Sequence, residues 1–258
     1  MRKLSLEGNI AAGKTSLLRH ISHKLTRNTT KPLKVIHEPV DAWQNLRRNK
    51  NTNLLHMFYN QPKRWAFTFQ TYAFLSRAKT AAHIIDSQQK NLQTNTTFLL
   101  ERSLHSDKQC FAKNAHQTGL FNDAEWAVYN DFYSWIMAQN PDITCDAYIY
   151  LRVKPATCLD RSKRRARKEE ATLSLEYLQQ LHALHEEWLA PGVEQHDGAD
   201  FCHTSREGKP VLVLNCEDDF VENALRREEI GNMVERFITD VSRLDEQPIE
   251  QDRQRAAI

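Results

Sequence analysis

The sequence predicts an α/β fold in which helices cover both faces of one parallel β-sheet. Five short apolar runs have the length and composition of buried strands, and helical patterns separate them. The connections between the runs are long enough for right-handed crossovers, so neighbouring strands can run parallel. A phosphate-binding motif follows the first run directly, as is common in α/β sheets. The predicted strands span residues 4–6, 33–36, 97–100, 147–153 and 211–214.

Residues 8–15 read Gly-Asn-Ile-Ala-Ala-Gly-Lys-Thr, which is the spacing of a P-loop. Leucine and isoleucine recur at helical spacing over residues 16–25, so we expect a helix to begin at the end of this loop. The backbone N–H groups and the helix dipole favour an anion there, and Lys14 adds a positive charge. The residues expected to surround the phosphates of a nucleotide are Gly8, Asn9, Ile10, Ala11, Ala12, Gly13, Lys14, Thr15 and Ser16.

Three longer helices are predicted from apolar spacing and from prolines near their ends. Pro62 suits the first turn of the first helix, where its missing N–H costs nothing, and Trp65 and Phe69 fit core-facing positions. Residues 1–243 are expected to form one domain, because one sheet would run through them. The remaining residues, 244–258, are polar and charged and are expected to form a flexible tail. The three helices are predicted over residues 62–85, 123–139 and 174–189.

Composition limits the partners of the 258-residue chain. Its net charge of +2 is close to neutral, and its apolar runs are too short for a membrane span, so neither nucleic acid nor a membrane is expected as a partner. The five cysteines are scattered without a Cys-x-x-Cys pair, which indicates single thiols in a reducing compartment. The first strand begins close to Met1 and leaves no room for a presequence. We therefore expect a cytoplasmic protein and do not expect a mitochondrial one.

Charged side chains follow the second and third predicted strands, where ligands gather in an open α/β sheet. Glu38 follows the second strand, and Glu101 and Arg102 follow the third. Glu38 is predicted to accept the proton of an attacking hydroxyl, with Arg102 holding the carboxylate ionised and in place. Glu101 and Thr15 are predicted to hold Mg²⁺ together with the nucleotide phosphates, directly or through water.

Residues 161–168 contain six cationic side chains, and two carboxylates follow at 169 and 170. Arg161 and Arg165 are four residues apart and so share one helical face, with Arg167 in the next turn. As a mobile lid, this segment would bring arginines over the γ-phosphate, neutralise charge in the transition state and exclude water. Glu169 and Glu170 would then meet the acceptor substrate. We define the lid as residues 161–172.

Several motifs in register resemble those of the deoxyribonucleoside kinases, in the branch of deoxycytidine and deoxyguanosine kinases. They span nearly the whole chain and include Glu-Gly-Asn-Ile-Ala-Ala-Gly-Lys-Thr from Glu7, Glu-Pro-Val at 38–40 with Trp43, Arg-Trp at 64–65, Phe-Gln-Thr-Tyr-Ala-Phe-Leu-Ser-Arg at 69–77, Glu-Arg-Ser at 101–103 with Asp107, and the lid. The resemblance implies a P-loop NTPase fold like that of adenylate and thymidylate kinases, with a five-stranded parallel sheet. It also implies transfer of the ATP γ-phosphate to a nucleoside 5′-hydroxyl, with Mg²⁺, by a homodimer.

The same resemblance assigns roles to individual residues. Tyr59 and Glu170 would hold the 3′-hydroxyl of the sugar. Gln70 would bind the edge of the base, with Arg77 and Asp107 completing that network. Asp219 and Phe220 would lie in the loop that contacts the base of ATP. The residues implied in nucleoside binding are Glu38, Trp43, Tyr59, Phe69, Gln70, Ala73, Arg77, Arg102, Asp107, Phe111 and Glu170, and those implied in catalysis are Lys14, Glu38, Arg102, Arg161, Arg165 and Arg167.

The combination of Ala73, Arg77 and Asp107 resembles enzymes for deoxycytidine and purine deoxynucleosides more than thymidine kinases. An Arg–Asp pair presents donors and acceptors to an amino-bearing base edge, which thymine lacks. The motifs do not decide between deoxycytidine and deoxyguanosine. The chain lacks the N-terminal extension of many cellular members, which suits a compact viral enzyme in the host cytoplasm or a divergent cytosolic one.

Two other functions are compatible with parts of the sequence. A nucleoside monophosphate kinase would share the P-loop and the lid, but its acceptor is an anion that Glu38 would repel. A catalytically silent relative can serve as a structural subunit, like the one in respiratory complex I that resembles these kinases. Such a subunit would not need Lys14, Thr15, Glu38, Glu101 and Arg102 together.

Overall fold

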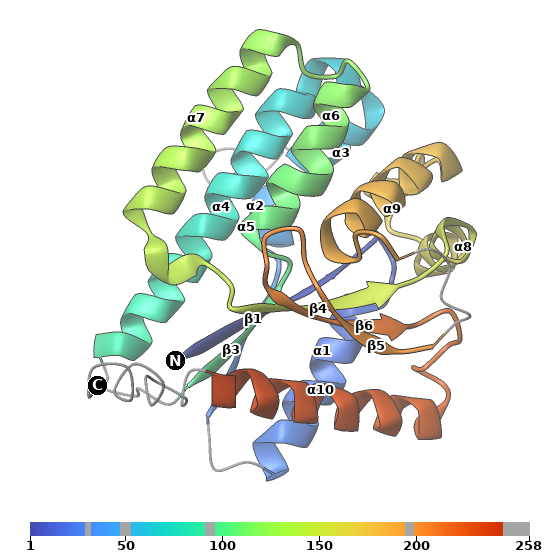
Figure 1. Cartoon of the computed structure of the whole chain (residues 1–258). Helices are drawn as coiled ribbons and strands as arrows, with labels where there is room; N and C mark the ends of the chain where they lie inside the picture. Colours follow the sequence, from blue (N-terminus) through green and yellow to red (C-terminus); the bar gives the residue numbers. More distant parts are fainter. Residues whose placement is uncertain (29–31, 47–52, 91–95, 194–198, 245–258) are drawn as a thin grey trace.

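The computed structural model describes residues 1–28, 32–46, 53–90, 96–193 and 199–244. Its centre is a six-stranded sheet in the order β2-β3-β1-β4-β6-β5 (Figure 1). Strand β1 lies in the middle, because it pairs with β3 on one side and with β4 on the other. The strands are β1 (Arg2–Gly8), β2 (Leu33–Ile36), β3 (Thr97–Glu101), β4 (Ala147–Arg152), β5 (Phe201–Thr204) and β6 (Pro210–Asn215).

All five strands expected from the sequence are present and run parallel, which confirms the predicted fold class. The prediction of five strands was incomplete, because β5 adds a sixth at the edge and runs antiparallel to β6. Its residues Phe-Cys-His-Thr contain no apolar run, and they alternate between half-buried and exposed. An edge strand is solvated on one side, so it needs less apolar sequence than a central strand.

The central strands are buried on both faces, and their side chains alternate between two hydrophobic cores. In β1, Leu4 and Leu6 belong to the core on one face of the sheet. In β4, Tyr148 and Tyr150 belong to the core on the other face, while Ile149 between them joins the first. Helices must therefore cover both faces.

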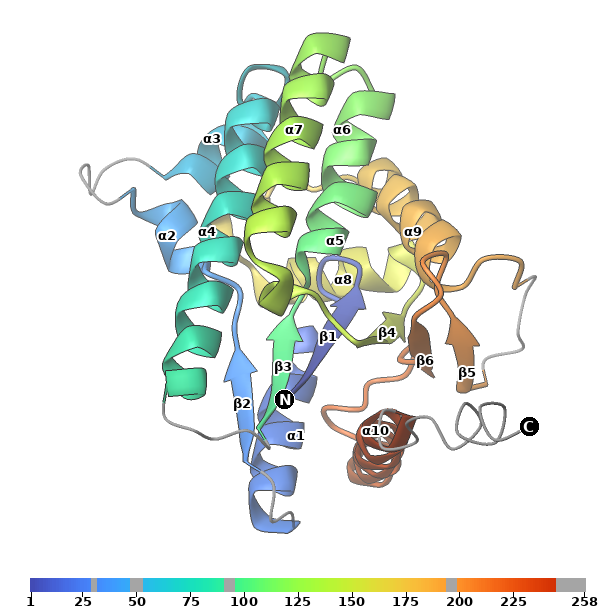
Figure 2. The same ribbon diagram turned by 60° about the vertical axis from the view of Figure 1, so that its left-hand side comes forward.

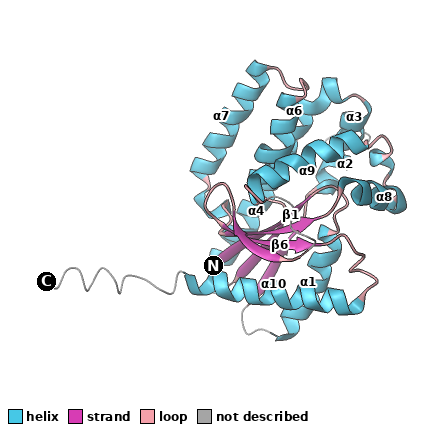
Figure 3. Cartoon of the chain, turned by 45° about the vertical axis from the view of Figure 1, so that its right-hand side comes forward, coloured by secondary structure: helices cyan, strands magenta, loops and turns pink. Residues whose placement is uncertain are grey.

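Helices α1 and α10 pack side by side against one face, below the sheet in Figure 1. The opposite face carries the larger helical layer, in which α4, α6 and α7 stand together (Figure 2). Figure 3 shows the strands between these two layers. The α-helices are α1 (Lys14–Asn28), α2 (Val40–Gln44), α3 (Leu54–Asn60), α4 (Pro62–Lys90), α5 (Leu104–Ser106), α6 (Lys113–Gln117), α7 (Asp123–Gln139), α8 (Pro155–Arg165), α9 (Leu175–Leu189) and α10 (Ala224–Leu244).

The three longer helices predicted from the sequence are α4, α7 and α9. Helix α7 has the predicted bounds, α4 continues beyond residue 85 to Lys90, and Ser174 caps α9 by accepting a hydrogen bond from the Tyr177 N–H. Residues 245–258 of the predicted tail lie outside the described residues. None of the described helices combines the length and apolar character needed to cross a lipid bilayer.

Candidate active site

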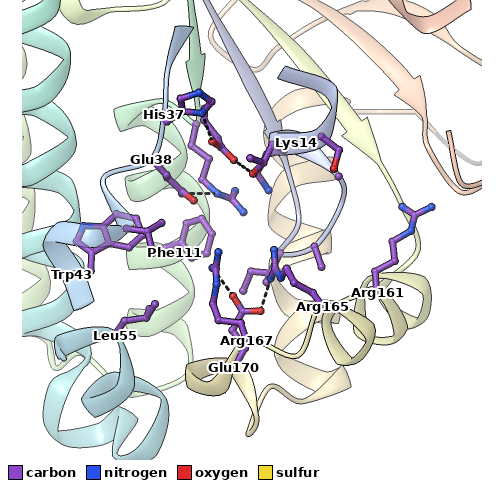
Figure 4. Close-up of a pocket in the computed structure, with 18 of the residues that line it drawn as sticks. Lys14, His37, Glu38, Trp43, Leu55, Phe111, Arg161, Arg165, Arg167 and Glu170 are labelled. Carbon is purple, nitrogen blue, oxygen red and sulfur yellow. Dashed lines mark hydrogen bonds and ion pairs between the residues drawn. The ribbon is translucent and has the colours of Figure 1, made fainter. Parts of the chain in front are cut away.

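A cavity of about 730 Å³ lies where β1, β2 and β3 end, between the P-loop, helices α2–α4 and the lid (Figure 4). It is lined by every residue predicted to act in catalysis, and by every residue predicted to bind the nucleoside or the metal. The parallel sheet explains why the P-loop, Glu38 and Arg102 meet there, since residues that follow neighbouring parallel strands emerge at the same end of the sheet.

The P-loop connects the end of β1 to the start of α1. Lys14 is buried, and its Nζ donates to the carbonyl oxygens of Gly8 at 3.0 Å and Asn9 at 2.7 Å. Three of the predicted phosphate-binding residues do not line the cavity. Asn9 instead donates from its side chain to the Leu178 carbonyl at 2.8 Å, so it connects the loop to α9. The loop residues that do line the cavity are Ile10, Ala11, Gly13, Lys14, Thr15 and Ser16, and those behind it are Gly8, Asn9 and Ala12.

Thr15 and Glu101 are in direct contact, because the Thr15 hydroxyl donates to one oxygen of the Glu101 carboxylate. The other carboxylate oxygen lies 3.2 Å from Nδ1 of His37. A hydroxyl and a carboxylate are oxygen ligands of the kind that Mg²⁺ prefers, so the pair fits this ion. In the described part of the chain, no group of three or more His, Cys, Asp and Glu side chains is arranged to hold a metal. Phosphates and water would have to complete the coordination.

Glu38 lies between two arginines. Its Oε1 is 3.1 Å from Nε of Arg102 and 3.0 Å from Nη2 of Arg77. Burial alone would raise the pKa of Glu38, but Arg77, Arg102 and the nearby Lys14 outweigh burial and hold this pKa below its ordinary value. The contact with Arg102 was expected from the sequence. The contact with Arg77 was not, because Arg77 comes from the middle of a helix and not from the end of a strand.

The backbone at Arg102 has a left-handed conformation, with φ of +62°. Such a conformation is costly for a residue other than glycine, and it persists where the surroundings enforce it. Here the Arg102 N–H donates to the Leu6 carbonyl at 3.0 Å, and the Ser103 N–H donates to the buried Glu7 carboxylate at 2.8 Å. The resulting bend directs the Arg102 guanidinium over the ring of Phe111, 4.6 Å from its centroid.

Arg77 and Asp107 form a buried ion pair, with 2.8 Å between Nε and Oδ2. Asp107 opens a π-helical turn over Asp107–Ala112, an irregular form that is frequent at functional sites. Burial raises the pKa of Asp107 despite its arginine partner, whereas Asp107 and Glu38 raise the pKa of Arg77 against the effect of burial. Gln70, one turn before Ala73 on α4, is also buried against the cavity.

Aromatic side chains form the wall opposite the P-loop. Trp43 and Phe69 meet edge to face, with ring centroids 5.6 Å apart. The Trp43 indole N–H donates to the Ser76 hydroxyl at 2.8 Å, which fixes the ring orientation. Phe69 also stacks on Phe58 at 4.8 Å. Trp43 and Phe69 were predicted from the sequence. Leu55, Phe58 and Tyr177 are among the lining residues that were not.

The lid begins on α8 and turns at Ala166, which has φ of +52°. Arg165 and Arg167 both bind the Glu170 carboxylate, with 2.9 Å between Nη1 of Arg167 and Oε1 of Glu170 (Figure 4). Arg161 lies apart from this cluster and donates to the backbone carbonyl of Glu217 at 2.9 Å. The sequence grouped Arg161 with Arg165, but in this structure they have different partners.

Phe220 closes the other side of the P-loop. Its ring is buried and lies so near Gly13 that a Cβ atom on Gly13 would come within 2.9 Å of it. Asp219 lines the cavity beside it and accepts a hydrogen bond from the Val221 N–H at 3.0 Å. The P-loop end of the cavity thus has an aromatic side chain beside it, where it could meet the base of a nucleotide whose phosphates lie in the loop.

The cavity has two chemically different ends. The P-loop end offers cations and backbone N–H groups, and the other end offers a carboxylate and aromatic rings. An anion suits the first, and an uncharged acceptor with a hydroxyl group suits the second. The fold and this cavity define a P-loop kinase.

Comparison with known proteins identifies the class more closely. Residues 4–239 match the sequence profile of the deoxynucleoside kinase family. The chain is 37% identical to deoxycytidine kinase 2 of Gallus gallus over 252 residues, which cover 93% of this chain and 91% of that protein. It is 36% identical to a probable deoxycytidine kinase of Fowlpox virus (93% and 89% covered) and 34% identical to the mitochondrial deoxyguanosine kinase of Xenopus laevis (92% and 90%). The chain belongs to the deoxynucleoside kinase family.

Proposed function

We propose that this protein transfers the γ-phosphate of ATP to the 5′-hydroxyl of a deoxyribonucleoside. The observation that carries the proposal is the position of Glu38, a carboxylate between Arg77 and Arg102 in the cavity that also contains the P-loop. The names of its relatives, deoxycytidine and deoxyguanosine kinases, agree with this acceptor. We further propose that residues 1–243 work as one catalytic domain.

In this mechanism Glu38 accepts the proton of the 5′-hydroxyl. Its lowered pKa keeps it ionised near neutral pH, and a weak base suffices because the phosphoryl transition state is loose and depends mainly on positioning and charge. Lys14 and the P-loop N–H groups hold the outer phosphates. Thr15 and Glu101 would hold Mg²⁺, which neutralises phosphate charge when bound. Arg161, Arg165 and Arg167 neutralise the charge on the transferred group as the lid meets ATP.

The nucleoside occupies the aromatic end of the cavity. Its base lies between Trp43, Phe69 and Phe111 and is read by Gln70, Arg77 and Asp107. Tyr59 and Glu170 bind the 3′-hydroxyl, and Asp219 and Phe220 contact the base of ATP. We propose that deoxycytidine and purine deoxynucleosides are preferred over thymidine, because the Arg77–Asp107 pair complements an amino-bearing base edge and Ala73 leaves space beside it.

Steady-state phosphorylation of deoxycytidine, deoxyguanosine, deoxyadenosine and thymidine with Mg-ATP, compared by kcat/KM, tests the substrate class. Thymidine is expected to rank last, and Arg77→Met combined with Asp107→Ala is expected to raise its rank by removing the charged pair. If the double variant keeps the wild-type ranking, Arg77 and Asp107 do not read the base. If a folded protein that binds ATP phosphorylates none of the four, the result would instead support a catalytically silent structural subunit or a nucleoside monophosphate kinase.

We also propose that the protein is a homodimer. Helix α7 presents Val128, Phe132 and Trp135 on one side, and these apolar side chains are 43%, 46% and 64% exposed. Their spacing of four and three residues places them on a single helical face, which association with a second copy would bury. All five cysteines lie in the described part of the chain as free thiols, which supports a reducing compartment such as the cytoplasm.

A further inference from the structure

Glu169 and Glu170 are neighbours in the lid, but only Glu170 lines the cavity. The Glu169 carboxylate faces α2 and α3 instead. Its Oε1 accepts two hydrogen bonds, from Nε2 of Gln44 at 2.9 Å and from Nδ2 of Asn53 at 2.8 Å. Both partners are more than a hundred residues away in the sequence, so these bonds connect the lid to a distant part of the chain.

The two partners belong to the elements that carry the nucleoside end of the cavity. Gln44 is the last residue of α2, directly after the wall residue Trp43. Asn53 caps α3 by accepting a hydrogen bond from the His56 N–H at 2.9 Å, and α3 contributes Tyr59 to the cavity. The side chain of Asn53 thus holds the start of α3 through its oxygen and the lid through its nitrogen.

A third hydrogen bond joins the same two regions. The Thr172 hydroxyl donates to the Tyr59 carbonyl at 3.2 Å. The hydrogen bonds to Glu169 also have an electrostatic consequence, because they outweigh partial burial and hold the pKa of this carboxyl below its ordinary value. Glu169 is therefore an ionised acceptor near neutral pH, and hydrogen bonds to charged acceptors are stronger than those to neutral ones.

Glu169 and Glu170 leave the same turn toward different partners. Lys168–Glu170 form a single 3₁₀ turn, in which successive side chains point about 120° apart. When Glu169 is fixed on Gln44 and Asn53, Glu170 points into the cavity, where it binds Arg165 and Arg167 and accepts a hydrogen bond from Ser162 at 3.0 Å. Release of Glu169 would let the turn rotate and displace this cluster.

We propose that Glu169 is a positioning residue that closes the lid over the acceptor. Together with Gln44 and Asn53 it forms a latch, which we call the Glu169 latch. The latch holds the nucleoside walls on α2 and α3 against the turn that carries Glu170, so it sets the affinity for the acceptor more than the affinity for ATP. The identity of the acceptor rests on the proposed function, but the mechanical role of the latch does not.

An exchange of the two partners tests the latch without removing any residue of the cavity. Gln44→Glu places a carboxylate against Glu169 and should open the lid. Adding Glu169→Gln should close it again, because the amide introduced at position 169 can donate to the carboxylate introduced at position 44 while its oxygen accepts from Asn53. Glu176→Gln is the matched control, since Glu176 is an exposed carboxylate on α9 whose hydrogen-bond donor is Gln180 on the same helix.

Two measurements report the result. The first is the rate at which trypsin cleaves the native protein at the lid bonds, assigned by mass spectrometry; these bonds follow Lys163, Arg164, Arg165, Arg167 and Lys168. The second is the KM for the nucleoside relative to the KM for ATP. Gln44→Glu is expected to raise both the cleavage rate and the nucleoside KM by about tenfold or more, in line with the loss of the Gln44 hydrogen bond to a charged acceptor, with the ATP KM unchanged. The exchange variant should return both values to within about threefold of wild type.

The proteolysis readout separates the latch from the proposed function. If no deoxynucleoside is phosphorylated but Gln44→Glu accelerates lid cleavage and the exchange reverses it, the latch stands and the assigned acceptor fails. If the enzyme is active and Gln44→Glu changes neither lid cleavage nor the nucleoside KM, the latch is refuted. Failure of the exchange variant to restore either value would also refute it, because the effect of Gln44→Glu would then not pass through Glu169.

Discussion

Lys14 shows how a single side chain is prepared for an anion. In the free protein its ammonium group is buried and has only backbone carbonyls as hydrogen-bond acceptors among the described residues. Burial, with a smaller contribution from Arg102, lowers its pKa from 10.5 to about 7. ATP phosphates beside Nζ would reverse this effect, since an opposite charge favours the protonated form.

The lowered pKa predicts that ATP binding takes up a proton above neutral pH. At pH 8 Lys14 is mostly neutral in the free protein and would be charged in the complex, so uptake should approach about one proton per ATP bound. Titration calorimetry in two buffers of different ionisation enthalpy measures this number. Lys14→Met should abolish the uptake, whereas equal uptake in wild type and variant would assign the proton to another group.

Glu38 shows which contacts of a single residue could be predicted from the sequence and which could not. Its place after a strand and the place of Arg102 after the next strand in the chain were sufficient to predict their contact. Arg77 also reaches Glu38, but helical periodicity only places it on one face of α4 and does not say whether that face meets water or a cavity. Glu169 is similar. It and Glu170 are adjacent carboxylates that the sequence does not distinguish, and only the structure shows that their side chains point to different partners.

At the scale of elements, local signals predicted α7 completely. Its apolar spacing and Pro141 beyond its end were the signals used, and the predicted bounds match the observed Asp123–Gln139. The structure contains the reciprocal capping box, in which the Glu125 N–H donates to the Asn122 side chain and the Asn122 N–H donates to the Glu125 side chain, both at 2.9 Å. The strand β5 and the π-helical turn had no such signal, because pairing at a sheet edge and insertion of a residue into a helix depend on tertiary contacts.

The capping box gives a prediction about stability alone. Asn122→Ala should lower the free energy of unfolding by about 1 kcal/mol, because an N–H at the start of α7 loses its acceptor. Asn122 does not line the cavity, so the KM values should be unchanged. Urea denaturation at one protein concentration measures the effect, and Asn122→Asp, which keeps the acceptor, is the control. An Asn122→Ala protein as stable as wild type would show that the cap contributes nothing.

At the scale of the whole molecule, the sheet brings the carboxyl ends of β1, β2 and β3 together at the cavity. On one face of the sheet, the larger helical layer leaves part of α7 exposed. The parallel sheet and its helical layers followed from apolar runs and their spacing. The exposed apolar face of α7 did not, because the same spacing would fit a helix with that face in the core.

That face predicts the oligomeric state. Phe132→Glu combined with Trp135→Glu should convert a dimer into a monomer, because two buried carboxylates would oppose association. Size-exclusion chromatography with light scattering measures the mass directly. Leu225→Glu is the matched control, since Leu225 is 80% exposed on α10, away from α7. A wild-type monomer, or a double variant that remains dimeric, would exclude this face as the interface.

The central claim is that Glu38 activates a nucleoside 5′-hydroxyl for attack on the γ-phosphate of ATP. The most direct measurement is the identity and rate of formation of the product from deoxycytidine and Mg-ATP, by chromatography and mass spectrometry, in wild type and Glu38→Gln. We predict deoxycytidine 5′-monophosphate from the wild type, a rate lower by roughly 10²–10⁴-fold in the variant, and unchanged ATP affinity. A 5′-monophosphate formed equally fast by Glu38→Gln, or a wild-type product phosphorylated elsewhere, would contradict the account.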